Sequence, residues 1–141
     1  EKDEKKGFEL TSKAASKCHA RAEYNLATMF YHGIGVEANR KKANELFNRS
    51  ADQGFSSAHS TLGLHTSKSS SGRNDEIKAE MHFKIAEMLG ETQEEKTMFS
   101  GSRKMMTKYM KPDAVAEAHS LAKEYVSKTP KPADYLFNYY K

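Results

Sequence analysis

The sequence repeats itself at an interval of 36 residues, and this period constrains the fold more than any single residue does. Small, apolar and glycine positions of one copy return in the next, and most of the aligned pairs are identical. The first copy contributes Ala22, Leu26, Ala43, Phe47, Ser50 and Gly54, and the second contributes Ala58, Leu62, Ala79, Phe83, Ala86 and Gly90. One step back by the same interval aligns Leu10 with Leu46, so a partial copy precedes the first. A repeat of this length indicates stacked structural units.

Within each copy, the spacing of the apolar residues predicts two antiparallel helices. In the first copy, one helical stripe consists of Ala22, Leu26, Met29 and Phe30, and the next of Ala43, Leu46, Phe47, Ser50 and Ala51. Gly33 and Gly35 lie between the stripes, where a turn with positive φ is most readily made by glycine. Gly54 and Gly90 follow the second helices, a position that favours glycine. Such a hairpin cannot bury its apolar face alone, so we expect it to stack on its neighbours.

The segment from Ala22 to Gly54 resembles the Sel-one-like repeat, a relative of the tetratricopeptide repeat. The matching positions are Ala22, Leu26-Ala27, Phe30-Tyr31, Gly33-Ile34-Gly35-Val36, Lys42-Ala43, Leu46-Phe47, Ser50-Ala51 and Gly54. The second copy departs from the pattern in its loop, residues 65–72, which lacks the Gly-x-Gly-Val sequence. The stretch from Met110 to Tyr125 is similar to the helix that often closes bacterial members of the family. The resemblance covers residues 4–127 and implies an all-α, right-handed α/α superhelix of hairpins, a solenoid.

The periodic segments predict seven helices and almost no strand. The expected helices cover residues 4–17, 20–32, 40–53, 56–66, 75–88, 92–109 and 113–127. Pro112 stands where a helix commonly starts. We therefore expect one repeat domain over 1–141, with a partial repeat at 1–18, repeats at 19–54 and 55–90, a degenerate hairpin with a capping helix at 91–127, and a tail at 128–141.

The composition fits this single domain, because 37% hydrophobic and 30% charged residues are ordinary for an exposed helical array. No apolar run approaches the roughly 18 residues that a membrane span needs. The single cysteine, Cys18, excludes an internal disulfide framework. It occupies a closing-glycine position and is expected to be a small packed residue, with a reactive thiol or an intermolecular bridge as the alternative.

The chain carries a net charge of +4, but most of its charges alternate in sign along the predicted helices. The most basic cluster, Arg103, Lys104, Lys108 and Lys111, would align on one side of the expected helix 92–109 and its end. No nucleic-acid motif accompanies it, so a solvated helix face is the expectation and polyanion binding is the alternative.

No catalytic, metal or cofactor site is expected from the sequence. The six histidines lack the spacing and the cysteine companions that zinc sites use. The Ser-rich segment 69–73 lacks the Gly-x4-Gly-Lys-Ser/Thr arrangement of a phosphate-binding loop and follows no predicted strand, so it is interpreted as an inter-helix loop.

A binding surface remains, on the concave side that the first helix of each hairpin lines in this architecture. The candidate partner-binding residues are Tyr24, Thr28, Tyr31 and His32 in the first repeat, Ser60, Leu64, Ser67 and Lys68 in the second, and Lys96, Ser100, Arg103 and Lys104 in the third. The surface would change from aromatic and neutral to basic, which suits a peptide or protein with an acidic end. The alternative for each residue is an ordinary exposed or hairpin-packing role.

The resemblance implies a non-enzymatic scaffold or adaptor that holds a protein or peptide, as in bacterial envelope, secretion or signalling systems. An inhibitor or immunity-type partner of a toxin or enzyme is one alternative, and a polyanion-binding module is another. A periplasmic or secreted location is expected if a signal peptide has been removed, and a cytoplasmic one otherwise. The aromatic tail, residues 135–140, is expected to seal the terminal hydrophobic face, with a partner anchor as the alternative.

Overall fold

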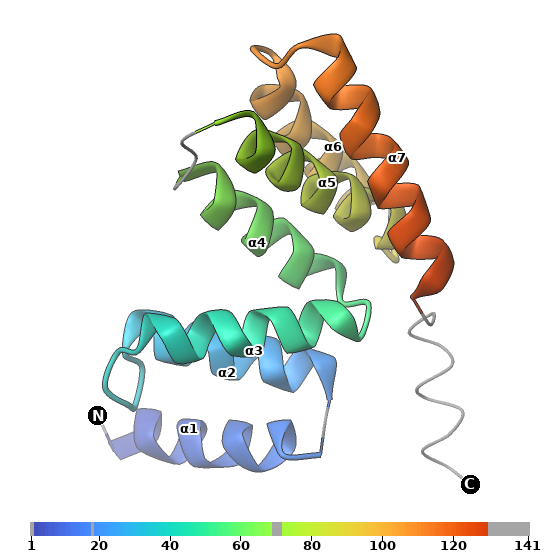
Figure 1. The fold of residues 1–141 in the computed structure, drawn as a ribbon. Helices are drawn as coiled ribbons and strands as arrows, with labels where there is room; N and C mark the ends of the chain where they lie inside the picture. The colour runs from blue at the N-terminus through green and yellow to red at the C-terminus, as the bar shows by residue number, and fades with distance from the viewer. Residues whose placement is uncertain (1, 18, 69–71, 130–141) are drawn as a thin grey trace, which may run out of the picture. The chain divides into compact units, whose positions relative to one another are not determined.

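The computed structural model describes residues 2–17, 19–68 and 72–129, and within these ranges the chain is helical without a strand (Figure 1). The described helices are α1 (Lys2–Ala15), α2 (Ala20–His32), α3 (Arg40–Asp52), α4 (Ser56–Lys68), α5 (Arg73–Leu89), α6 (Gln93–Thr107) and α7 (Pro112–Lys128). The helices form two compact units, Glu1–Phe55 and Ser56–Lys141. The single domain over 1–141 stays a prediction.

In the first unit, α2 and α3 form the predicted antiparallel hairpin, and α1 packs along α2 (Figure 1). Gly33 ends α2 in the left-handed conformation with φ 74°, and its N–H donates to the carbonyl of Met29. Asn39 caps α3, because its side-chain oxygen accepts from the N–H of Lys42 at 3.0 Å. Gly54 follows α3 with φ 81°, so the glycine expected at this helix end is confirmed.

The core of the first unit consists of the residues that define the repeat. Its fully or nearly buried members are Leu26, Ala27 and Phe30 from α2 and Ala43, Leu46, Phe47 and Ala51 from α3. Phe8 of α1 packs edge to face on Phe30, with ring centroids 5.4 Å apart. Ser50 is buried at the hairpin contact and donates its hydroxyl to the carbonyl of Ala20 at 2.7 Å. The small residue of the repeat therefore also satisfies a backbone group at the start of α2.

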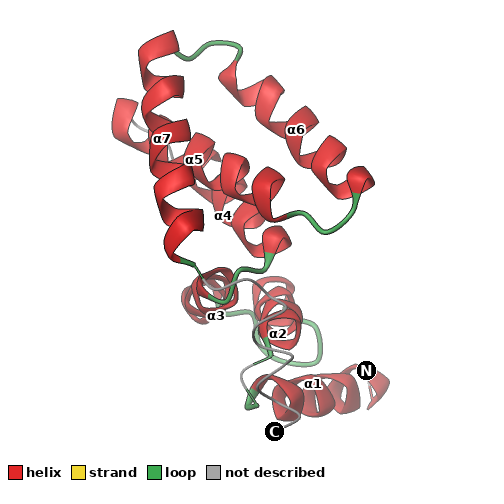
Figure 2. Ribbon diagram, turned by 90° about the vertical axis from the view of Figure 1, so that its right-hand side faces the viewer, coloured by secondary structure: helices red, strands yellow, loops and turns green. Residues whose placement is uncertain are grey.

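In the second unit, α4 and α5 form a second hairpin, and both α6 and α7 pack on α5 (Figure 2). Gly63 of α4 faces α5 closely, because an added Cβ would lie 3.2 Å from the Ala79 carbonyl oxygen and from the Phe83 ring. It stands 36 residues after Ala27, so both repeats place a small residue at this contact. Phe83, Ile85 and Phe99 are the large buried side chains of this core.

The predicted helix bounds agree with the structure to within two residues at each end, and α6 ends at Thr107 where residue 109 was expected. Gly90 ends α5 as predicted, with φ −53° and not a left-handed conformation. An added Cβ at Gly90 would lie 3.1 Å from Cγ of Lys96. Pro112 is the first residue of α7, as predicted. Cys18, part of the Ser-rich loop and the aromatic tail lie outside the described residues.

Candidate interaction site

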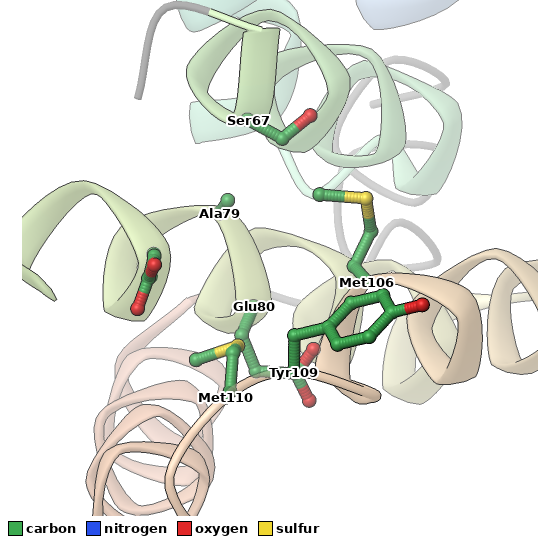
Figure 3. A pocket seen from close by; sticks show the side chains of 7 residues that line it. Ser67, Ala79, Glu80, Met106, Tyr109 and Met110 are labelled. Atoms are coloured by element: carbon green, nitrogen blue, oxygen red, sulfur yellow. The ribbon is translucent and has the colours of Figure 1, made fainter. Parts of the chain in front are cut away.

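The second unit contains a cavity of about 160 Å³ between the end of α4, the first half of α5 and the end of α6 (Figure 3). Its lining residues are Ser67 from α4, Glu76, Ala79 and Glu80 from α5, and Met106, Tyr109 and Met110 from α6 and the turn after it. The lining therefore combines an acidic helix face with two methionines and a tyrosine. We call this feature the unit-2 cavity.

The end of α6 places three of these lining residues. After Thr107 the chain makes a turn in which the N–H of Met110 donates to the Thr107 carbonyl at 3.0 Å. Pro112 then starts α7, and the residue before a proline disfavours helical geometry, so α6 cannot run on into α7. Met110 packs against the cluster of Ile77, Ala114 and Ala118, whereas Tyr109 remains almost fully exposed. The turn thus anchors one side chain in the core and presents the next to solvent.

Glu80, one of the lining residues of α5, contacts both α6 and α7 through its carboxylate. The side chain of Glu80 is fully buried. Its Oε1 accepts a hydrogen bond from Nη1 of Arg103 on α6 at 3.0 Å and lies 2.7 Å from Nε2 of His119 on α7. Its Oε2 has no hydrogen-bond partner in the described part of the chain. A buried carboxylate is costly unless it is paired, so this network holds α6 and α7 to α5 only while Arg103 and His119 stay in place.

Arg103 is also bound to a second carboxylate of α5. Its Nε lies 3.1 Å from Oε2 of Glu87, which in turn accepts a hydrogen bond from Lys84 at 2.9 Å. Burial by itself would raise the pKa of Glu87, but Lys84 and Arg103 outweigh it and hold that pKa below the ordinary value. Arg103 is therefore a positive charge held between two carboxylates of α5.

A pair of histidines joins α4 to α5 on another part of the unit. Nδ1 of His59 lies 3.1 Å from Nδ1 of His82, and the ring of Tyr125 on α7 packs edge to face on His59 at 5.2 Å. Burial lowers the pKa of His82 to about 4, because the charged imidazolium loses its hydration. His82 is therefore neutral at physiological pH.

The first unit holds a buried carboxylate at the corresponding repeat position, because Glu23 stands 36 residues before His59. Glu23 is fully buried in α2 and binds Arg49 of α3 and Gln53, the residue that follows α3 as its C-cap. Each hairpin therefore buries one polar side chain of its first helix against polar side chains of its second. Repeat-based interpretation of the sequence missed this feature.

Comparisons with known proteins bear on both units. The model of the Sel1 repeat family matches residues 1–17 and 20–55. The structure is also similar to the crystal structure of c5321, a protective antigen present in uropathogenic Escherichia coli strains that displays an SLR fold. The match covers 92% of this chain, with a TM-score of 0.74 and 26% sequence identity. Residues 1–17 and 20–55 are therefore Sel1 repeats, and the chain has an SLR-like fold. It spans 27% of the length of the c5321 chain. No curated protein matches it.

A Sel1-like repeat fold is generally a scaffold for protein–protein interaction and is typically not catalytic. None of the described helices is long and apolar enough to cross a membrane. Within the described ranges, no group of three or more His, Cys, Asp or Glu side chains is arranged to hold a metal ion.

In the first Sel1 repeat, the predicted partner-binding residues mostly pack within the hairpin. Tyr24 lies against the rings of Phe47 and Phe55, with centroids 5.4 and 5.3 Å away. The hydroxyl of Thr28 donates to the Tyr24 carbonyl at 3.0 Å. Tyr31 is half-buried, with the guanidinium of Arg40 over its ring at 5.4 Å and the ring of His32 beside it at 5.0 Å. Of these four candidates, His32 is the exposed one.

In the second unit, the predicted residues divide between packing positions and the surface. Leu64 and Lys68 are exposed, Ser60 is half-buried, and Ser67 lines the unit-2 cavity. Lys96 and Ser100 are half-buried, and Lys104 is exposed.

The prediction that Arg103, Lys104, Lys108 and Lys111 form one exposed basic row on α6 was wrong. The side chain of Arg103 is only 14% exposed and is bound to Glu80 and Glu87. Lys108 and Lys111 lie beyond the end of α6, and the Lys108 ammonium sits over the ring of Tyr109 at 5.4 Å.

The sequence analysis missed the exposed apolar residues of α6 and its following turn. Met98, Met105 and Tyr109 are 58%, 78% and 85% exposed. Their spacing of seven and four residues could have identified them, because residues at this spacing lie on one side of a helix. Phe99, the buried residue of α6, lies on a different side.

Proposed function

We propose that this protein is a scaffold that binds a segment of another protein at the unit-2 cavity and the adjoining surface of α6. The general role of the fold supports the class of function. The unit-2 cavity supports the proposed position of the binding site, because its lining residues come from α4, α5 and the end of α6, which pack against one another.

The size of the cavity is the observation that carries this proposal. Small-molecule and cofactor sites usually have volumes of about 300 to 1,000 Å³. The unit-2 cavity, at about 160 Å³, matches a single side chain better than a substrate or cofactor. A protein segment that inserts one anchoring side chain would fill it.

The lining has the chemistry of a protein-binding hot spot. Tyr109 stands at the cavity with most of its ring in solvent, and tyrosine is among the residues that contribute most to interface energy. Met106 and Met110 are unbranched and adapt their shape to an incoming side chain. Residues of this kind provide contact area for a bound protein segment.

The proposal is tested by affinity capture from the cells that produce the protein, with quantitative mass spectrometry of what is retained. The intact chain is compared with Tyr109→Ala, which removes the exposed ring, and with Ser67→Arg, which fills the cavity from the end of α4. Leu10→Ser, on an exposed apolar residue of α1, is the matched control. We expect one stoichiometric protein with the intact chain and the control, and its loss with both cavity variants. Retention unchanged by both cavity variants would place binding elsewhere.

Recovery of nucleic acid or lipid as the main retained material would instead favour the polyanion alternative. A steep fall of that recovery with added salt would distinguish it from binding of a protein segment.

A further inference from the structure

We infer that the exposed side of α6 docks an acidic amphipathic helix of the partner protein. The docking surface consists of Met98 and Met105 of α6 and Tyr109 of the turn after it, which we call the Met–Tyr stripe, with the exposed Lys104 on α6, Lys108 against the Tyr109 ring and Lys111 after the turn. This inference rests on the proposed function and names the chemistry of the partner.

The Met–Tyr stripe is exposed because α6 packs through a different side. Phe99 is buried and Arg103 binds Glu80 and Glu87, so these residues face α5. The three stripe residues are more than half exposed, although burial of methionine and tyrosine side chains is energetically favourable. Met98 and Met105 stand two helical turns apart, about 10 Å at 1.5 Å per residue. This length matches two turns of a partner helix.

Gly101 supplies a second, independent feature of the same helix side. It lies three residues after Met98 and four before Met105, and apart from the backbone of α6 itself no atom lies within 4 Å of the position of an added Cβ. A glycine inside a helix costs about 1 kcal/mol relative to alanine, and neither positive φ nor internal crowding requires it here. An open glycine between two exposed methionines lets the backbone of a partner helix approach closely.

The charges beside the stripe select an acidic partner. Lys104, Lys108 and Lys111 are exposed, and within the described ranges no carboxylate forms an ion pair with any of them. The acidic residues at the start of α7, Asp113 and Glu117, are bound to Arg73 at 2.8 and 3.4 Å. The Lys108 ammonium also lies over the Tyr109 ring, and Glu94, one turn before Met98, is an exposed carboxylate. The three lysines still give this surface a net positive charge that carboxylates of a partner can pair with.

The test uses three designed peptides of equal length that share one leucine-rich helix face. Their polar faces carry glutamate, glutamine or lysine, and each has a fluorescent label so that binding to the intact chain is followed by anisotropy. We expect the glutamate peptide to bind most tightly and the lysine peptide least. Met98→Ser combined with Met105→Ser should weaken the glutamate peptide by roughly tenfold or more, as loss of central apolar contacts does. Lys104→Glu combined with Lys108→Glu should reverse the order of the peptides.

Two control variants match these changes at exposed positions of the first unit. Leu10→Ser removes an exposed apolar side chain from α1, and Lys13→Glu combined with Lys41→Glu reverses two exposed charges. Both should leave the affinity order and the glutamate-peptide affinity unchanged. Circular dichroism of every variant verifies that the helices are retained.

The other outcomes overturn the inference in different ways. Stripe-dependent binding without a preference for glutamate would leave the docking surface but refute the acidic partner. Self-association of the intact chain that is lost in the methionine variant, without peptide discrimination, would identify a second copy as the occupant. Absence of binding by all three peptides refutes the inference, while capture of a partner sensitive to Tyr109→Ala and Ser67→Arg would still support the proposed function.

Discussion

Arg103 of α6 donates a hydrogen bond to Glu80 of α5, with 3.0 Å between Nη1 and Oε1, and the carboxylate that accepts it is fully buried. The two residues stand 23 positions apart in the sequence, so the bond joins helices rather than turns of one helix. Arg103 thereby serves the packing of α6 on α5. The lysine that follows it, Lys104, stays in solvent.

Arg103→Met should destabilise the protein by about 3 kcal/mol, because removal of one member of a buried ion pair leaves the other charge unpaired. His119 remains near Glu80 and keeps the loss from being larger. Lys104→Met on the next, exposed position is the matched control, and its effect should stay within about 0.5 kcal/mol. Urea unfolding followed by circular dichroism gives both values. Equal effects of the two substitutions would refute a structural role for the ion pair.

The histidine pair predicts a specific dependence of stability on pH. The pKa of His82 is lowered by burial from 6.5 to about 4 in the folded chain. Between pH 6.5 and pH 4 the unfolded chain therefore binds a proton at His82 that the folded chain does not bind. As a result, His82 does not reduce the free energy of unfolding above pH 6.5, and it reduces this free energy progressively as the pH falls toward 4. Between pH 7.5 and pH 5 the free energy of unfolding should decrease by about 2 kcal/mol from this group.

His82→Gln removes the titrating group and provides the control for this pH effect. The variant should lose stability at pH 7.5 but show a flatter decline toward pH 5 than the unmodified chain. Urea midpoints measured at both pH values test the difference. A variant whose stability declines as steeply as that of the unmodified chain would contradict the assignment to His82.

The hairpins were predictable from the sequence because the signals that specify them are local. The 36-residue period, the apolar spacing from Ala22 and the glycines at 33 and 35 each act within one hairpin. Both glycines adopt the positive φ that the turn was expected to require, 74° and 68°. The same pattern predicts that neighbouring hairpins stack, because each leaves an apolar face to cover, and this stays a prediction.

The candidate site was less predictable, because its contacts join residues far apart in the sequence. The sequence analysis did not single out Glu80 or Glu23, because their partners Arg103 and Arg49 lie 23 and 26 residues away. A translation of the first repeat by two periods placed Arg103 on the binding face. The degenerate third copy instead buries Phe99 and turns Arg103 toward α5, which leaves Met98 and Met105 in solvent.

Gly35 and Gly101 should respond in opposite ways to substitution by alanine. Gly35 has φ +68°, and an added Cβ would lie 2.3 Å from the backbone oxygen of Glu4 in α1. Gly35→Ala should therefore destabilise the protein by about 3 kcal/mol, from left-handed strain and from displacement of α1. Gly101→Ala has open space around it and should stabilise α6 by about 0.5 to 1 kcal/mol.

Thermal unfolding by calorimetry measures both glycine variants under one condition. Gly33→Ala separates the two causes at the turn, because it has a similar φ of +74° but no protein atom closer than 3.4 Å to the added Cβ. It should cost only the conformational strain, about 1 to 2 kcal/mol. If Gly33→Ala and Gly35→Ala cost the same, the close approach to α1 would contribute nothing.

The ion pair between Glu23 and Arg49 predicts an asymmetry, because its two members differ in burial. Glu23 is fully buried, whereas the side chain of Arg49 is 57% exposed. Arg49→Met leaves a buried carboxylate with Gln53 as its remaining side-chain partner in the described structure, and should cost about 3 kcal/mol. Glu23→Met leaves an arginine that water can solvate, so its cost should be nearer 1 kcal/mol. The double variant should resemble Glu23→Met, since the buried charge is absent from both. Urea unfolding of the three variants tests the order, and a larger loss for Glu23→Met than for Arg49→Met would refute the argument from burial.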